Sequence, residues 1–276
     1  MNLSEVFFAP KEDCNLYKST IGRDFTGKNF IYEAIIPFFC SQMTPNISII
    51  LPTLNEERGI IETLREINTL NLNKEVLVVD GLSTDNTITN AKSCGARIII
   101  EKRKGKGIAM ATGVKAAKSD IICFLDGDGT YPPRFIPKML KLIKNCDVVV
   151  ASRLLKKEGA NKCLNTFIHY RFFPFVFKNF LKKFKTSEPI TGMRLMRKKT
   201  WKKLNLNSHD FMIETEMEVK MAKEKMKVIE IPIPCVKRIG RSKWDSSWRT
   251  LFKIRTYVKI HEKYLKDLVV TKYSHV

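Results

Sequence analysis

Asp126 and Asp128 are the side chains of this sequence with the clearest capacity for chemistry. They follow the apolar run 121–125, which predicts a buried parallel strand, and α/β sheets bind ligands at the carboxyl ends of such strands. In extended chain the two carboxylates point the same way, and Mg²⁺ characteristically takes one or two such donors together with water and phosphates. The alternative is an acidic turn, because Asp and Gly are common turn residues. The preceding strand and the following Pro132-Pro133 favour a metal site.

The composition predicts one large domain with appendages. The chain has 276 residues, 44% of them apolar, and seven scattered cysteines without CxxC spacing. This pattern is typical of reduced thiols in a cytosolic compartment and gives no zinc site. No apolar run approaches the roughly 18 to 20 residues that cross a bilayer. The N-terminus also lacks the apolar core of a signal peptide.

The basic charge is concentrated in one segment. The formal net charge is +21, and residues 153–203 hold 15 Lys or Arg against two acids, Glu158 and Glu188. Such an excess requires an anionic partner or surface, which includes nucleic acid, anionic lipid headgroups and phosphorylated substrates. Nothing resembles an RNP motif, a zinc finger or a recognition helix, so nucleic acid is not an expected partner.

Strand and helix patterns alternate from residue 47 onward, which predicts an α/β fold with helices on both faces of a parallel sheet. The expected strands are 47–51, 75–80, 97–101, 121–125 and 147–152, and the expected helices are 56–70, 84–94, 107–117 and 133–144. Beyond residue 153 an edge strand is expected at 192–196, and a last strand at 227–233. Residues 1–42 differ from the rest, with weak periodicity and one modest helical candidate at 29–39.

Right-handed crossovers place the turns after the parallel strands along one rim of the sheet. Four turns should therefore converge on one crevice: 52–56, 80–85, 126–128 and 152–153. Structural alternatives exist for the first two. Thr53 and Glu56 have capping-box spacing, so Glu56 is either a helix cap or a ligand residue, while Ser83 is placed to cap the following helix.

The Gly105-Lys106-Gly107 turn excludes two classes of enzyme. A dinucleotide fingerprint needs a third glycine where Met110 stands, and no GxxxxGK[ST] loop is present, so neither hydride transfer nor P-loop chemistry is expected. Lys106 and its basic neighbours lie either near donor phosphates or in solvent.

A helix that carries Glu214, Glu216 and Glu218 is expected after the edge strand. Glu214 and Glu218 share one of its faces, whereas Glu216 points elsewhere. Acidic positions on helices are usually solvated. Either Glu214 or Glu216 is a candidate general base or a residue that orients a loop.

Two basic amphipathic segments flank this helix in the sequence, one before it and one after it. In 164–185, aromatic side chains lie on one helical stripe and lysines on another, which is typical of a helix in a membrane interface; the alternative is a helix packed on the core. The C-terminal stretch 245–276 has the same basic amphipathic pattern. Between them, the glycine loop 237–243 is suited to gripping an anion.

Seven motifs in order resemble the family 2 glycosyltransferases of the dolichyl-phosphate mannose synthase and dolichyl-phosphate glucose synthase group, over about residues 45–260. They are ISIILPTLNEE (47–57), VVDGLSTDNT (78–87), DGD (126–128), ASR (151–153), EPITGMR (188–194), FMIETE (211–216) and RIGRSK (238–243). The resemblance implies a GT-A fold, a nucleotide-sugar donor, Mg²⁺ or Mn²⁺, and a polyprenyl phosphate acceptor.

Residue roles follow from the same resemblance. It implies that the nucleoside pocket is lined by Pro52, Leu54, Glu56 and Asp80, that Asp126 and Asp128 hold the metal on the diphosphate, and that Arg153 faces the acceptor phosphate. Arg238 and Lys243 would close over donor and acceptor. The sequence departs from the family at Gly81-Leu82 and at Glu188, while DGDGTYPP is more similar to the glucose or N-acetylhexosamine branch, which favours a UDP donor.

The predicted organisation is an N-terminal extension (1–42, with Met43 as a possible translation start), a GT-A domain (43–244) and a C-terminal basic helix (245–276). The predicted function is transfer of a hexose from a nucleotide sugar to dolichyl or polyprenyl phosphate, by a peripheral protein on the anionic cytoplasmic face of the cell membrane. One alternative is a GT-A enzyme that acts on a sugar hydroxyl. Another is a non-enzymatic membrane or nucleic-acid binder. The oligomeric state stays open.

Overall fold

The computed structural model describes residues 21–23, 29–31, 46–155 and 185–240. The chain divides into two compact units, Met1–Thr44 and Pro45–Val276. The described part of the first unit is an antiparallel hairpin of β1 (Ile21–Arg23) and β2 (Asn29–Ile31). The predicted helix at 29–39 is therefore wrong at its start, because those residues pair as a strand.

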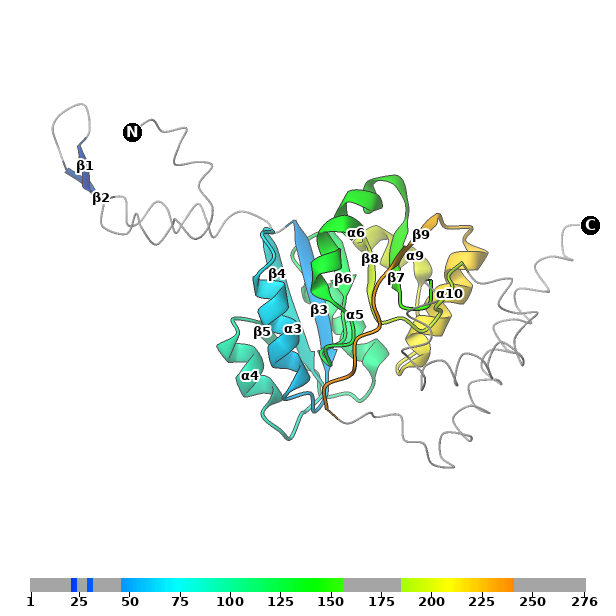
Figure 1. The fold of residues 1–276 in the computed structure, drawn as a ribbon, viewed down its shortest axis with the longest axis horizontal. Helices are drawn as coiled ribbons and strands as arrows, with labels where there is room; N and C mark the ends of the chain where they lie inside the picture. Colours follow the sequence, from blue (N-terminus) through cyan, green and yellow to red (C-terminus); the bar gives the residue numbers. More distant parts are fainter. Residues whose placement is uncertain (1–20, 24–28, 32–45, 156–184, 241–276) are drawn as a thin grey trace, which may run out of the picture. The chain divides into compact units, whose positions relative to one another are not determined.

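The second unit is built on a seven-stranded sheet with helices on both faces (Figure 1). The strand order is β5-β4-β3-β6-β8-β7-β9, and every pairing is parallel except those of β8. The predicted α/β fold is confirmed. The strands are β3 (Ile47–Thr53), β4 (Lys74–Asp80), β5 (Arg97–Ile100), β6 (Ile121–Phe124), β7 (Val148–Ser152), β8 (Arg194–Arg197) and β9 (Val228–Pro232).

The predicted helices are present near their expected positions, with later starts for the first two. The described helices are α3 (Gly59–Asn68), α4 (Thr87–Ser93), α5 (Lys106–Ala116), α6 (Ile136–Leu142) between the short helices η3 (Pro133–Phe135) and η4 (Ile143–Asn145), α9 (Lys198–Leu204) and α10 (Met212–Lys223). Of these, α9 is a helix that was not predicted. No described helix combines the length and the apolar character that crossing a membrane requires.

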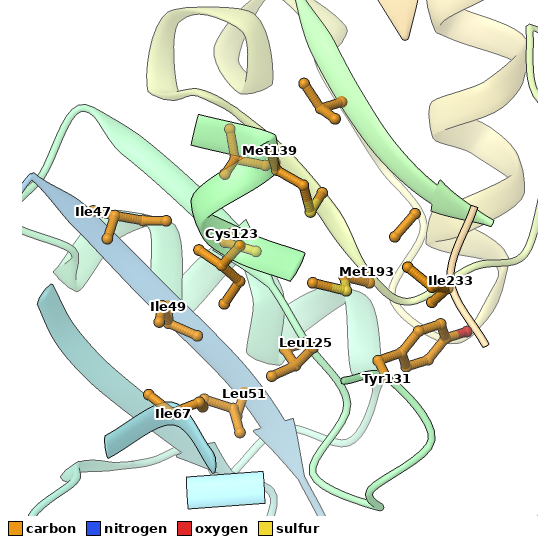
Figure 2. Close-up of a cluster of buried hydrophobic side chains, with 14 of the residues drawn as sticks. Ile47, Ile49, Leu51, Ile67, Cys123, Leu125, Tyr131, Met139, Met193 and Ile233 are labelled. Atoms are coloured by element: carbon orange, nitrogen blue, oxygen red, sulfur yellow. The ribbon is translucent and has the colours of Figure 1, made fainter. Parts of the chain in front are cut away.

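Alternate side chains of each strand pack into two hydrophobic cores, one on each face of the sheet. On β3, Ile47, Ile49 and Leu51 contribute to the core covered by α3, α4 and α6 (Figure 2), whereas Ile50 contributes to the core covered by α5, α9 and α10. All four are fully buried. Burial on both faces explains why β3 is an almost continuous apolar run.

Strand β8 corrects one prediction. The sequence predicts an edge strand at 192–196, but β8 pairs antiparallel with β6 on one side and with β7 on the other. Its first residue, Arg194, is fully buried and forms an ion pair with Glu218, so the charge does not require an edge position. Among the described strands, β5 and β9 lie at the edges of the sheet.

Three of the described cysteines are consistent with the predicted reduced thiols. Cys94, Cys123 and Cys146 are free thiols, and burial raises the pKa of Cys123 to about 12, which makes it unreactive.

Candidate active site

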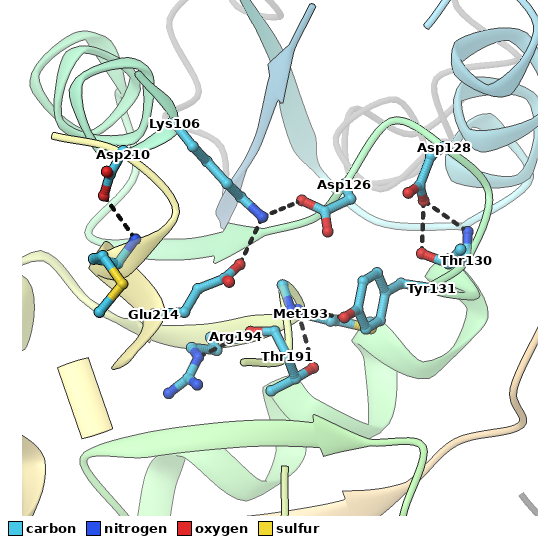
Figure 3. Close-up of polar contacts among 12 residues, drawn as sticks. Lys106, Asp126, Asp128, Thr130, Tyr131, Thr191, Met193, Arg194, Asp210 and Glu214 are labelled. Atoms are coloured by element: carbon cyan, nitrogen blue, oxygen red, sulfur yellow. Dashed lines mark hydrogen bonds and ion pairs between the residues drawn. The ribbon is translucent and has the colours of Figure 1, made fainter. Parts of the chain in front are cut away.

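The loop after β6 presents Asp126 and Asp128 to different partners (Figure 3). Residues 127–128 form a turn, so the extended geometry expected from the sequence does not hold. Asp128 accepts hydrogen bonds from the backbone N and Oγ1 of Thr130 (3.0 and 2.6 Å). Helix α3 starts directly against this loop: a Cβ at Gly59 would stand 2.7 Å from the Cα of Asp128 and from the carbonyl of Gly127.

Lys106 joins Asp126 to helix α10. Its Nζ lies 2.6 Å from Oδ1 of Asp126 and 2.6 Å from Oε1 of Glu214, and its side chain is only 10% exposed. Burial alone would lower the pKa of Lys106, but the two carboxylates outweigh it and raise that pKa. The alternative of a solvated Lys106 is therefore wrong.

The turn before α5 explains how Lys106 reaches this position. Gly105 has φ 136°, and a Cβ there would stand 2.8 Å from the carbonyl carbon of His209, so only glycine permits this approach. The loop that carries His209 is held by Glu216, which accepts from the backbone N of Asn207 (3.0 Å) and Ser208 (2.7 Å).

The three acids of α10 are buried, which corrects the expectation that they are solvated. Glu214, Glu216 and Glu218 are 5%, 1% and 0% exposed. Each has a different partner: Lys106, the 207–208 backbone with Lys220, and Arg194. Burial raises the pKa of Glu214. For Glu216, burial acts in the same direction, but the Lys220 and backbone hydrogen bonds outweigh it and lower the pKa.

Arg153, which follows β7, lies between Glu188 and Tyr131. Glu188 is fully buried and accepts from the backbone N (2.6 Å), Nε (2.7 Å) and Nη2 of Arg153. The guanidinium lies over the ring of Tyr131, 4.6 Å from its centroid. The hydroxyl of Tyr131 accepts from the backbone N of Gly192 (2.9 Å), and burial raises the pKa of that phenol.

Arg238 connects the first and third turns of the rim. Its guanidinium contacts the carboxylates of both Glu56 and Asp128, and the N of Ile239 donates to the carbonyl of Asp128 (3.0 Å). Glu56 is 8% exposed and does not cap α3, whose N-cap is Arg58. The capping alternative for Glu56 is therefore wrong.

The first two turns are joined by hydrogen bonds around Asp80. This buried carboxylate accepts from Thr53 Oγ1 (3.3 Å) and from the backbone N and Oγ of Ser83 (2.7 and 2.5 Å). Ser83 thus closes the turn rather than capping α4, whose N-cap is Asn86. Pro52 belongs to β3, and Leu54 is 40% exposed on the rim beside Gly81.

These contacts unite the four predicted turns. Asn55 accepts from the N of Thr84 (2.8 Å), Arg238 bridges Glu56 to Asp128, and Arg153 stacks on Tyr131, three residues after Asp128. No individual signal marks Tyr131, Thr130 or Gly59 in the sequence, because their roles depend on packing. Lys243 and all of segment 164–185 except Lys185 lie outside the described residues.

The charges of this rim fit a divalent cation. Among the ion-paired side chains that the structure describes at this rim, five carboxylates face three cations, which leaves an excess of two negative charges in these pairs when all are ionised. The acids are Glu56, Asp126, Asp128, Glu188 and Glu214, and the cations are Lys106, Arg153 and Arg238. In the described part of the chain, no three His, Cys, Asp or Glu side chains form a ready-made metal cage. The donor set therefore suits Mg²⁺ or Mn²⁺ bound by one or two carboxylates together with ligand phosphates.

Fold and rim together define a glycosyltransferase of the GT-A class. The model of the Glycosyl transferase family 2 matches residues 48–204, and the chain belongs to this family. The predicted resemblance and the predicted enzyme class are confirmed, and the alternative of a non-enzymatic binder is wrong.

Two named relatives are similar to this chain over most of its length. The chain is 30% identical over 202 residues to a dolichyl-phosphate hexose transferase of Haloferax volcanii, a match that covers 72% of this chain and 87% of that protein. It is 29% identical over 226 residues to a dolichol-phosphate mannosyltransferase of Pyrococcus furiosus, which covers 77% of this chain and 62% of that protein.

Solved structures support the fold. Glucosyl-3-phosphoglycerate synthase of Mycobacterium tuberculosis, crystallised with Mg²⁺ and uridine diphosphate, superposes with a TM-score of 0.58 at 19% identity, over 72% of this chain and 73% of that chain. The same enzyme with Mn²⁺, UDP-glucose and phosphoglyceric acid gives a TM-score of 0.57. The predicted GT-A fold is confirmed by this likeness.

Proposed function

We propose that this enzyme transfers a hexose from a nucleotide sugar to a polyprenyl phosphate of the dolichyl type. The observation that carries the proposal is the position of Arg153. Its guanidinium lies on Tyr131, whose hydroxyl meets Gly192, and Gly192 is in contact with the carboxylate of Asp126. A cation that suits a phosphate acceptor therefore lies next to the residues that suit a metal-bound diphosphate. The names of the relatives support the same acceptor.

Transfer to a phosphate acceptor requires electrostatic stabilisation of the negative charges rather than a general base. A phosphate monoester has its second pKa near 6, so the acceptor is largely dianionic at neutral pH. One of its oxygens attacks C1 of the sugar and forms the new C1–O bond. The bond from C1 to the donor diphosphate breaks, and the nucleoside diphosphate leaves with the electron pair.

Asp126 and Asp128 would hold Mg²⁺ or Mn²⁺, which supplies Lewis-acid stabilisation of the leaving diphosphate. Lys106 is next to Asp126 and would neutralise a diphosphate that enters there. Arg238 would release Asp128 and close over the substrates. Pro52, Leu54, Glu56 and Asp80 would hold the nucleoside, and we propose a uridine nucleotide because UDP complexes exist for the structural neighbour.

A transferase that acts on a sugar hydroxyl needs a general base. Glu216 is 1% exposed and its carboxylate already accepts from two backbone N–H groups and Lys220, which suits a loop-orienting residue better than a base. Glu214 is held by Lys106. These contacts favour the phosphate acceptor over the hydroxyl acceptor.

We also propose that the enzyme works as a peripheral protein on the cytoplasmic face of the cell membrane. The support is the chemistry of the acceptor, whose chain is a lipid, and the concentration of basic residues in 153–203. Cosedimentation with vesicles of anionic and of neutral lipid tests this part. Equal binding to both vesicle types would exclude an electrostatic membrane surface.

A transfer assay tests the central proposal. The protein is incubated with UDP- and GDP-sugars, Mg²⁺ or Mn²⁺, and either short polyprenyl phosphates or simple sugars, and the products are identified by mass. A polyprenyl phosphate hexose supports the proposal. A product formed only with sugar acceptors would replace it with the hydroxyl reaction.

A further inference from the structure

A fully buried ion pair lies beneath the candidate site and takes no part in the chemistry proposed above. Arg194, the first residue of β8, donates from Nη1 to Oε1 of Glu218 on α10 (2.6 Å). The two side chains are 1% and 0% exposed. Substrates therefore do not reach either residue, and any role in transfer must be indirect.

Arg194 also forms hydrogen bonds that hold the residues preceding it in the sequence. Its Nε donates to the carbonyl of Thr191 (3.1 Å), and its Nη2 donates to the carbonyl of Pro189 (2.6 Å). One planar guanidinium thus holds two carbonyls and one carboxylate in fixed directions. The single ammonium of a lysine cannot reproduce this geometry.

The segment held in this way, residues 188–192, supports both sides of the site. Its Glu188 accepts three hydrogen bonds from Arg153. Its Thr191 donates to the carbonyl of Ala151 (2.7 Å), and its Gly192 contacts the carboxylate of Asp126. A shift of this segment would therefore move the acceptor-side arginine and the metal-side aspartate together.

Stability alone does not account for the pair. A buried ion pair is often no more stabilising than apolar side chains of similar volume, because both charges lose their hydration. Burial raises the pKa of Glu218 even though Arg194 and Thr186 act to lower it, so the charge of Glu218 is costly to bury. The fixed direction of the guanidinium is the feature that apolar residues would not supply.

We propose that Arg194, held by Glu218, is a positioning residue that sets the orientation of Arg153 through the 188–192 segment. The inference rests on the proposed function in one respect, namely that Arg153 binds the acceptor phosphate. It assigns the pair a role in acceptor binding that is separable from folding.

Two variants and a matched control test the role in transfer. Arg194→Lys keeps the positive charge opposite Glu218 but loses the planar guanidinium and its fixed hydrogen-bond directions. The double variant R194M/E218L removes both charges, and R65M/E62L makes the same change in the exposed Arg65–Glu62 pair of α3. We expect the first two to raise the KM for the acceptor about 10- to 100-fold while uridine nucleotide with Mn²⁺ still binds. The control should behave as the wild type.

Thermal unfolding separates positioning from folding. If R194M/E218L unfolds near the wild-type temperature and has lost acceptor affinity, the positioning role is supported. A folded Arg194→Lys variant with the wild-type acceptor KM and kcat would overturn it.

A measurement without acceptor keeps this inference distinct from the proposed function. In protein labelled with ¹⁵N-arginine, the Nε–H signal of Arg153, assigned by its loss in Arg153→Lys, should be shifted and exchange faster in Arg194→Lys, while that of Arg103 stays unchanged. An unchanged Arg153 signal overturns the inference. A wild-type protein inactive on polyprenyl phosphate would instead count against the proposed function alone.

Discussion

Gly192 lies so close to Asp126 that the carboxylate leaves no room for a side chain at position 192. A Cβ there would stand 2.8 Å from Cγ of Asp126 and still closer to Oδ2. The same glycine donates its backbone N–H to Tyr131. The start of β8 is therefore shaped around the first aspartate of the loop after β6, which couples two segments that are far apart in the sequence.

The variant Gly192→Ala should therefore impair transfer more than folding. The new methyl group would displace the carboxylate of Asp126 from its present position, and a displacement of about 1 Å can lower turnover about 100-fold. We expect a large loss of kcat with Mn²⁺ and a smaller change in the unfolding temperature. Steady-state kinetics together with calorimetry measures both.

Gly95→Ala is the opposite control. Gly95 has φ 79°, and no heavy atom of the described residues beyond its chain neighbours lies within 4 Å of an added Cβ, so alanine there should cost about 1 kcal/mol of stability through strain alone. Its kcat should stay at the wild-type value. Normal turnover in Gly192→Ala would show that the position of Asp126 is not critical.

The variant Asp128→Ala should abolish transfer and leave the fold intact. Loss of one preorganised charged ligand typically lowers kcat by about 10³-fold. Thr130 and Arg238 lose a partner, but Arg238 keeps Glu56. The control Asp120→Ala removes an exposed carboxylate from the opposite end of β6. Turnover by Asp128→Ala equal to that of Asp120→Ala would exclude the metal site.

The positions of the parallel strands in the sequence and the meeting of the rim turns were predictable because both follow from local patterns. Apolar runs such as 47–51 define buried strands, and right-handed crossovers then place the following turns on one edge. The contact of Arg238 with Asp128 is consistent with that geometry, although 110 residues separate the two.

The burial of charged residues was not predictable in the same way. Lys106 and Glu214 are 108 residues apart, and each is a typical surface residue until the other neutralises it. The interior position of β8 likewise goes together with the burial of the Arg194–Glu218 pair. The periodicity of apolar residues reports the average polarity of one face of a helix or strand. It does not show which charged residue, distant in the sequence, will pack against that face.

Glu101, which precedes α5, should make the free energy of unfolding depend on pH. Hydrogen bonds from Arg103 and Thr112 lower its pKa to about 2 from an ordinary value of 4.5. Because the folded-state pKa is depressed, its contribution is present above about pH 4.5 and is lost as the pH falls toward 2. Glu101→Gln should therefore lower the free energy of unfolding by about 2 kcal/mol at pH 7, and the difference should shrink at pH 3.

Urea unfolding of wild type and Glu101→Gln at both pH values measures this difference. The exposed Glu62, which forms an ion pair with Arg65 at 3.1 Å, provides the control variant Glu62→Gln. That variant should show little effect at either pH, because exposed ion pairs contribute little. A difference for Glu101→Gln that is the same at pH 7 and pH 3 would contradict the assigned pKa.

Arg238 should act against metal binding before the donor arrives. Its guanidinium contacts Asp128 and Glu56, so a divalent cation at Asp128 meets a positive charge already in place. Removing that charge in Arg238→Ala should tighten Mn²⁺ binding in the absence of nucleotide by roughly tenfold, equivalent to about 1.4 kcal/mol. The same variant should turn over more slowly, because the guanidinium is then unable to close over the substrates.

Arg134→Ala, which removes an exposed arginine paired with Glu66, is the matched control and should change neither value. Titration of Mn²⁺ by its paramagnetic resonance signal gives the affinity, and weaker binding by Arg238→Ala would show that Arg238 supports the metal site rather than competing with the cation.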